Sequence, residues 1–315
     1  MVRRIVRLPA VTIRSLAVAL CAAVAVLAAV AAGAGVFLRG NLATEPFVTV
    51  RGESVDLLVG GIYRYNGVAI AAEGVGWDIV TLFLVVPALA LVLPALRRGS
   101  LRAELAALGL LVYFLYQYLE YVTFLAYGPL FLVYTAIVGL GVSAIALVAS
   151  GLDLRVLAAS VGPGFPRRGV IGLALLIPIL LGGMWLPLVG RSLGSAVVPE
   201  LNGGTTLVVQ AFDLGLLVPL GLFTAVTLLR RQAAGYVLGA IVVVKSASMG
   251  TAIAAMLVVE GLATDVWQYP PIVLFAAIGL AGAVLVARLF RSIHDPAGRP
   301  SQPHFARTTT EAPAR

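Results

Sequence analysis

Long, nearly uncharged runs of apolar residues are the feature that most constrains how this 315-residue chain can fold. Hydrophobic residues make up 61% of the sequence and charged residues only 11%, whereas soluble domains carry about 25% charged residues. Crossing the ~30 Å hydrocarbon core of a bilayer takes roughly 20 apolar residues in a helix. The runs therefore predict an all-α, polytopic transmembrane helix bundle whose main partner is the lipid bilayer.

Eight runs are long enough to span a membrane. We place them near residues 15–38, 78–96, 104–126, 130–149, 169–190, 207–229, 233–259 and 272–290. The longest connection, residues 39–77, is expected to form an outer loop. The segment 292–315 is rich in proline and polar residues, and we expect it to be a disordered cytoplasmic tail. The bundle itself thus covers residues 1–291.

Arginine is unevenly divided between the two sides of this predicted bundle. With the N-terminus inside, 17 arginines fall in inner segments and only 4 in outer ones, namely Arg39, Arg51, Arg64 and Arg191. The positive-inside rule then puts both termini in the cytoplasm of a multi-pass protein, and we expect a bacterial inner or plasma membrane. The same distribution explains the net charge of +8 without a nucleic-acid partner.

Histidine and cysteine are almost absent from the predicted spans. The two histidines, His294 and His304, lie in the tail, and Cys21 is the only cysteine. Haem and zinc sites need such ligands inside the bundle, and no Walker, GxSxG or HExxH motif is present. We therefore predict no metal and no cofactor.

Four ionisable residues fall within or at the ends of the spans: Asp78, Glu120, Asp213 and Lys245. A charge at the bilayer centre costs about 2.5 to 3.5 kcal/mol on insertion scales, so such residues face the bundle interior or a water-filled cavity. Lys245 is the only lysine in the chain. Each of the four is a candidate functional residue.

The third predicted span contains the densest polar group, in the stretch LVYFLYQYLEYVTF. At about 100° per residue, one helix face carries Tyr113, Tyr116, Gln117 and Glu120. The alternative is structural: Tyr118 and Tyr121 would then belong to an interfacial aromatic belt, with Glu120 shallow enough to reach water.

Lys245 and Asp213 are expected at similar depths on antiparallel neighbouring helices. Three interpretations of the lysine stay open: an ion pair with Asp213, a lysine that titrates or binds an anionic ligand group, and a side chain that reaches the interface. The small residues of SASMGTAIAA, which include Ser248 and Ala252, are typical of buried helix contacts in membranes.

Two segments of the chain echo each other. Asp78, Pro87 and the pair Arg97–Arg98 recur as Asp213, Pro219 and the pair Arg230–Arg231. Four spans separate the matching helices, which would make any internal repeat a parallel 4+4 repeat. Many transporters are built from repeats and bind substrate between them.

The runs WDIVTLFLVVPALALVLPALRR, GPLFLVYTAIVGL, VVQAFDLGLLVPL and GYVLGAIVVVKSASMG resemble a family of bacterial polytopic membrane proteins without an assigned function. The resemblance covers about residues 60–260. It implies the same topology and draws attention to Asp78, Asp213 and Lys245, but it implies no substrate or cofactor.

Three classes of function fit these features. The first is binding or transport of a small solute, ion or lipid head group in an outward-opening polar pocket lined by Asp78, Tyr113, Tyr116, Gln117, Glu120, Gln210, Asp213, Lys245 and Ser248. The second is a non-catalytic membrane partner or sensor subunit. The third is an intramembrane enzyme, with Lys245 as base and Ser248 as nucleophile. We favour the first.

Overall fold

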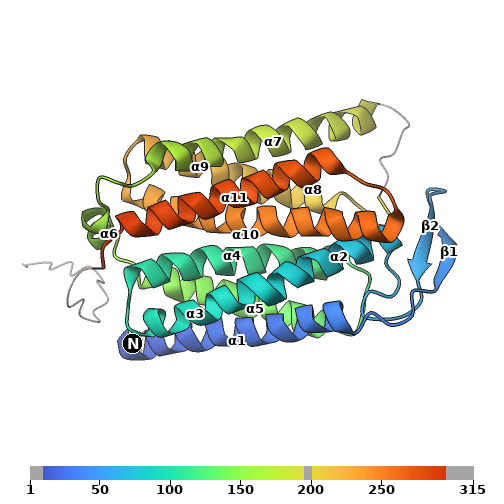
Figure 1. The fold of residues 1–315 in the computed structure, drawn as a ribbon, viewed down its shortest axis with the longest axis horizontal. Coiled ribbons are helices and arrows are strands. Elements are labelled where there is room, and N and C mark those ends of the chain that lie inside the picture. Colours follow the sequence, from blue (N-terminus) through green and yellow to red (C-terminus); the bar gives the residue numbers. More distant parts are fainter. Residues whose placement is uncertain (1–9, 195–200, 296–315) are drawn as a thin grey trace, which may run out of the picture.

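The computed structural model describes residues 10–194 and 201–295, and most of these residues are helical (Figure 1). Eight helical segments of this part are long and apolar enough to cross a membrane: Ile13–Phe37, Val68–Arg97, Leu101–Phe124, Phe131–Ser150, Arg167–Leu193, Val208–Leu229, Ala233–Thr264 and Tyr269–Ser292. The predicted all-α bundle of eight spans is confirmed. The second span begins at Val68, ten residues before the predicted start, so Glu73 and Trp77 belong to a helix.

The helices that form the spans, together with one short helix, are α1 (Ala10–Phe37), α2 (Val68–Val80), α3 (Val86–Arg97), α4 (Leu101–Phe124), α5 (Phe131–Ser150), α6 (Leu154–Ser160), α7 (Arg167–Gly194), α8 (Val208–Phe212), α9 (Val218–Leu229), α10 (Ala233–Thr264) and α11 (Tyr269–Ser292). Two π-helices, η1 (Thr81–Val85) and η2 (Asp213–Leu217), join α2 to α3 and α8 to α9. Helix α6, with 7 residues, is part of none of the eight spans.

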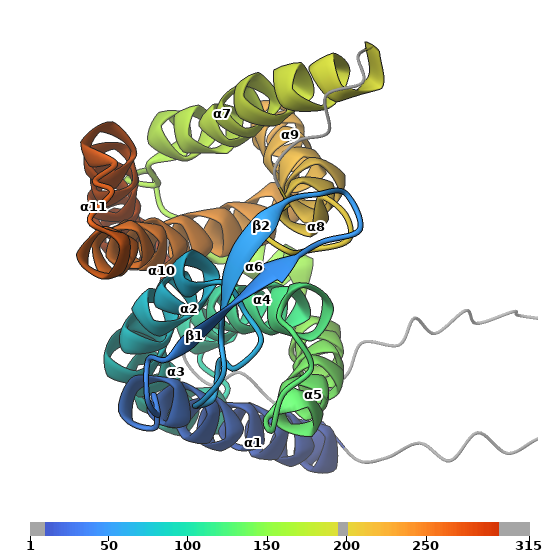
Figure 2. The ribbon, with the colours of Figure 1, turned by 90° about the vertical axis from the view of Figure 1, so that its right-hand side faces the viewer.

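The spans form two groups of four. The helices α1, α2–α3, α4 and α5 pack together, and α7, α8–α9, α10 and α11 form a second, more open group (Figure 2). Helix α10 joins the groups because it packs against α2 and α4 as well as α9 and α11. In the second group α7 packs mainly on α9 and α11 mainly on α10, while α7 and α11 make little contact with each other.

Small residues set the distance between α10 and α11. A Cβ atom added at Gly250 would lie 2.6 Å from the backbone nitrogen of Gly279, and one added at Gly282 would lie 2.6 Å from that of Ala247. The SASMGTAIAA stretch thus makes a close helix contact, as its composition predicts. Ala247, Gly250 and Thr251 of this stretch meet Gly279 and Gly282 of α11.

Both π-helices precede a proline. Pro87 and Pro219 have no N–H, and a proline ring clashes with the carbonyl four residues earlier. The preceding turn is widened, so that the N–H of Val86 bonds to the oxygen of Thr81 and the N–H of Val218 bonds to that of Asp213. Each widened turn begins with a buried polar residue, Thr81 in η1 and Asp213 in η2.

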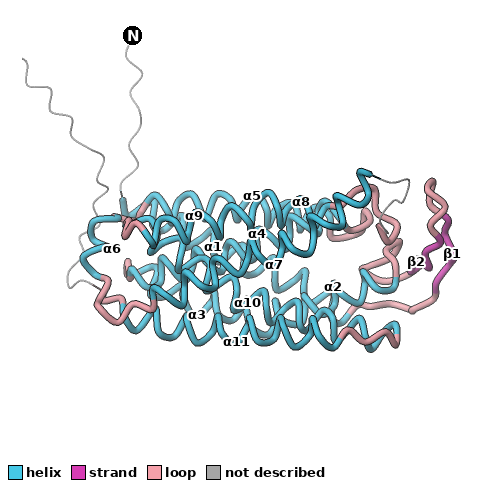
Figure 3. The backbone as a smooth tube through the Cα atoms, turned by 90° about the horizontal axis from the view of Figure 1, so that it is seen from above, coloured by secondary structure: helices cyan, strands magenta, loops and turns pink. Residues whose placement is uncertain are grey.

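A two-stranded hairpin lies at one end of the bundle, which we call the hairpin end (Figure 3). Strand β1 (Thr44–Val48) pairs antiparallel with β2 (Ser54–Leu58), with Pro46 opposite Asp56. Glu53 in the turn accepts a 2.8 Å hydrogen bond from the backbone N–H of Asn202, and Arg51 donates to the Gly204 carbonyl. The predicted outer loop thus contains a hairpin that holds the connection leading into α8.

The opposite end, which we call the termini end, carries α6 and the start of α1 (Figure 1). Ile293 forms a β-bridge with Val161, and Asp295 accepts a 2.7 Å hydrogen bond from the Leu101 N–H at the start of α4. The first residues of the predicted tail are therefore attached to the bundle. His304 and the rest of the tail lie outside the described residues.

Candidate functional site

A cavity of about 450 Å³ lies in the hairpin half of the bundle, where the two groups of helices meet. Its walls come from α2, α4, η2 and α10, and from the loosely packed pair α7 and α11. Five of the residues singled out from the sequence line it: Tyr116, Glu120, Gln210, Asp213 and Lys245. Depth in the membrane related Asp213 to Lys245, and helix periodicity related Tyr116 to Glu120.

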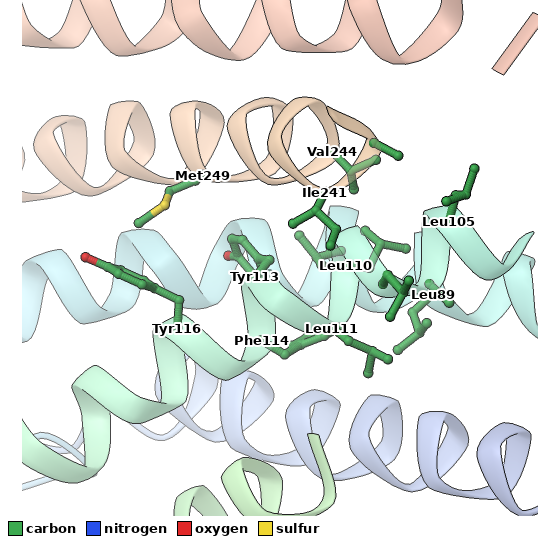
Figure 4. Packing of buried hydrophobic residues seen from close by; sticks show 14 of the residues in the cluster. Leu89, Leu105, Leu110, Leu111, Tyr113, Phe114, Tyr116, Ile241, Val244 and Met249 are labelled. Atoms are coloured by element: carbon green, nitrogen blue, oxygen red, sulfur yellow. The ribbon is translucent and has the colours of Figure 1, made fainter. Parts of the chain in front are cut away.

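Lys245 is the centre of the polar wall, with only 4% of its surface exposed. Its ammonium lies 4.0 Å from the centre of the Tyr116 ring and donates to the sulfur of Met249, one turn further along α10. Figure 4 shows Tyr116 and Met249 pointing toward each other from α4 and α10. A desolvated cation over an aromatic ring is stabilised by the negative face of that ring.

Asp213 is held by two donors. The Tyr116 hydroxyl donates to Oδ1 at 2.5 Å, and the Trp185 indole N–H donates to Oδ2 at 2.8 Å. Among the described residues no hydrogen bond or direct ion pair joins Asp213 to Lys245; the two charges are connected through Tyr116, which offers its ring to the ammonium and its hydroxyl to the carboxylate. The simple ion pair considered from the sequence is therefore replaced by a three-residue arrangement.

Two more carboxylates face the cavity, Glu120 and Glu73. Glu120 follows Tyr116 by one turn toward the hairpin end and is close enough to interact electrostatically with both Lys245 and Asp213. Glu73 lies near Glu120 and Glu260. In the described part of the chain no side chain or backbone donor bonds to Glu73, so its carboxyl group faces the cavity without a hydrogen-bond partner.

Three of the predicted site residues lie behind the cavity wall. Tyr113 and Gln117 each make a 2.8 Å hydrogen bond with Thr81 at the start of η1. Asp78, only 1% exposed, accepts hydrogen bonds from Tyr63 and Tyr121. The polar face predicted on the third span thus serves two places: Tyr116 and Glu120 face the cavity, while Tyr113 and Gln117 bond to Thr81 between α4 and η1.

The Tyr63 hydroxyl belongs to the loop before α2, outside the membrane-spanning segments. Burial, and next the nearby Asp78 carboxylate, raise the pKa of Tyr63 well above its usual value. Tyr63 therefore stays protonated and remains a hydrogen-bond donor to Asp78. This contact ties the hairpin loop to the second span.

Ser248 is turned away from the lysine amine. Its hydroxyl donates to the carbonyls of Val244 and Lys245 at 2.9 and 3.1 Å, within its own helix, and it does not line the cavity. A Ser/Lys nucleophile–base pair needs the hydroxyl within reach of the amine. The geometry gives the enzyme interpretation no support.

Several residues of the site escaped the sequence reasoning. Glu73 was assigned to the outer loop because the second helix was expected to start at residue 78. Trp185 occurs in an apolar span. Its indole N–H could have indicated a nearby acceptor, because a buried tryptophan usually finds one. Ser246 lines the cavity without a charge to mark it.

Among the described residues, no group of three or more His, Cys, Asp or Glu side chains is arranged to hold a metal ion. Comparison with known proteins gives no match to a family model, a curated protein or a solved structure. The resemblance noted from the sequence therefore reaches only as far as the general class, a polytopic helical membrane protein.

Proposed function

We propose that this protein binds a small solute in the cavity between its two groups of helices, as a carrier or receptor in the membrane. The observation that carries the proposal is the convergence of ionisable and aromatic side chains from four separate segments, α2, α4, η2 and α10, on one cavity. Buried charges are costly in a membrane and mark ligand or ion pathways. A volume of about 450 Å³ is within the range of small-molecule sites.

The arginine distribution supports access from outside the cell. Arg39, Arg51 and Arg64 belong to the connection at the hairpin end, whereas the paired arginines 97–98 and 230–231 end helices at the termini end. By the positive-inside rule the hairpin end, and with it the cavity, faces outward. A multi-pass protein of the cell membrane with cytoplasmic termini follows from the same rule.

A thermal-shift screen of the detergent-purified full chain tests solute binding. The panel consists of amino acids, carboxylates, amines and sugars, and binding to the folded state raises the melting temperature. We expect at least one class to do so in wild type and to lose its effect in Lys245→Met and in Glu120→Gln. Asp78→Asn is the matched control, because Asp78 is buried and ionisable but lies behind the cavity wall.

The proposal would be contradicted if no class shifted melting, or if the shift were the same in wild type and in both cavity variants. Loss of the shift in Asp78→Asn as well would point to general destabilisation and would also count against a site in this cavity.

A further inference from the structure

The ionisable side chains of the cavity differ in the hydrogen-bond partners that the protein gives them. Asp213 already accepts from Tyr116 and Trp185. The Lys245 ammonium has three N–H groups, yet in the described part of the chain it has no oxygen acceptor, only the Met249 sulfur and the Tyr116 ring. A nine-tenths buried lysine that faces a cavity in this state has capacity for an anionic oxygen from a ligand.

The carboxylates show the opposite deficiency. Glu73 has no donor among the described residues. Glu120 lies near the Tyr116 hydroxyl, but that hydroxyl has one proton, which goes to Asp213 at 2.5 Å. Both glutamates line the cavity, and both have capacity for a cationic donor.

The positions of Lys245 and Glu120 along their helices allow one small ligand to reach both side chains. Lys245 lies over the ring of Tyr116, and Glu120 is one helical turn from Tyr116, about 6 Å along α4. Charge-assisted hydrogen bonds are about 2.8 Å long, so a carboxylate and an ammonium carried on one carbon atom are compact enough to lie between the two side chains. A larger separation of charges in the ligand is not required.

The walls that α7 and α11 form are mostly apolar. Helix α7 contributes Ile177, Leu181 and Met184, and α11 contributes Phe275 and Ile278. A side group placed against them leaves water for an apolar surface, which favours an apolar body. The cavity volume of about 450 Å³ admits a small molecule of this kind.

Building on the proposed function, we infer that the cavity binds a small zwitterion of the apolar α-amino-acid class, with its carboxylate on Lys245, its ammonium on Glu120 and its apolar side group between α7 and α11. Glu73 lines the same cavity near Glu120. Neither a simple amine nor a simple carboxylate satisfies both deficiencies.

Matched ligands test this inference by isothermal titration calorimetry on the purified full chain. L-leucine carries both charges, 3-methylbutylamine lacks the carboxylate, and 4-methylpentanoate lacks the ammonium. We expect leucine to bind at least about tenfold more tightly than either analogue, because each analogue leaves one buried charge without its partner.

Two variants assign the charges. In Lys245→Met leucine should fall to the affinity of the amine, and in Glu120→Gln it should fall to that of the carboxylate. Asp78→Asn should keep the wild-type preference. Either assignment stands or falls separately, so failure of one variant to fold leaves the other as a test.

Equal binding of leucine and the amine, or of leucine and the carboxylate, would overturn the zwitterion inference. So would absence of binding by all three. If other solutes still raise the melting temperature and lose that effect in the cavity variants, solute binding stands while the amino-acid class falls; if no solute does so, both fail.

Discussion

Tyr116 connects two opposite charges that do not touch each other. Its ring faces the Lys245 ammonium and its hydroxyl bonds to Asp213. Helix periodicity singled out Tyr116, and their charge within apolar spans singled out Lys245 and Asp213, but the order of contacts depends on side-chain directions, which spacing alone does not give. The third span was expected to provide one polar face, but the hydrogen bonds that Tyr113 and Gln117 of α4 make with Thr81 of η1 divide that face.

The two roles of Tyr116 can be separated by substitution. Tyr116→Phe keeps the ring but removes the hydroxyl, leaving one oxygen of Asp213 without its donor, and we expect a loss of about 1 to 3 kcal/mol in the free energy of unfolding. Tyr116→Leu also removes the ring and should cost up to about 2 kcal/mol more. Unfolding in mixed micelles measures both.

Tyr118→Phe is the control for these variants, because among residues 10–194 and 201–295 the Tyr118 hydroxyl makes only a 3.3 Å bond to the Ala28 carbonyl. Its loss should cost less than about 1 kcal/mol. If Tyr116→Phe were no more destabilising than Tyr118→Phe, the proposed bond to Asp213 would contribute nothing.

Tyr63 predicts a pH dependence. Burial raises its pKa in the folded state, so its contribution to stability is complete below the unfolded pKa of about 10 and is lost as the pH rises through the folded pKa. Tyr63→Phe should therefore cost about 1 to 3 kcal/mol at neutral pH, and the difference from wild type should shrink above about pH 10. A constant difference between pH 8 and pH 11 would contradict the assignment.

Among the helices, the two π-helices that precede prolines change how the two similar segments of the sequence align. Thr81 and Asp213 each begin a π-helix and each stand six residues before a proline. The structural counterpart of Asp213 is therefore Thr81, not Asp78. Both counterparts bond to a tyrosine of α4, Thr81 to Tyr113 and Asp213 to Tyr116. A π-helical turn shifts the residues that follow it by one position relative to an α-helix. Counting with the α-helical period therefore gives the wrong helix face beyond such a turn.

The contact between α10 and α11 gives a prediction for whole helices. Gly250→Ala places a methyl group where the backbone of Gly279 lies, and overpacking of this kind typically costs about 1 to 3 kcal/mol. Gly183→Ala in α7 is the matched control, since its Cβ would have no neighbour within 4 Å, and alanine is the better helix former by about 1 kcal/mol. Equal melting temperatures for the two variants would contradict the close packing.

At the scale of the whole molecule, hydropathy was sufficient for the number of spans, because the length of an apolar run is set by membrane thickness. It was insufficient at the hairpin end. There α2 extends ten residues beyond the expected start and packs against α10, with the Trp77 indole N–H on the sulfur of Met256. Strands β1 and β2 depend on pairing between segments with no long apolar pattern, so the outer loop gave no strand signal.

Which polar residues line the cavity, and which lie behind its wall, also depends on the whole bundle. Tyr116 and Glu120 border the cavity because α7 and α11 leave space opposite them, whereas Tyr113 and Gln117 are covered by η1. No single helix contains that information. The composition of the spans indicated buried polar groups, and only the arrangement of all the helices distinguishes those that line the cavity.

Thiol labelling at two serine positions of α10, each replaced by cysteine, tests most directly whether the cavity opens to the outside. Ser246 and Ser248 are similarly buried, at 8% and 5% exposure, but Ser246 alone of the two lines the cavity. In a Cys21→Ala background, which removes the chain's one cysteine, we predict that Ser246→Cys reacts with a membrane-impermeant methanethiosulfonate added outside intact cells, whereas Ser248→Cys does not. Equal reactivity of the two cysteines, or labelling of Ser246→Cys only from the cytoplasmic side, would contradict a solute cavity that opens at the hairpin end.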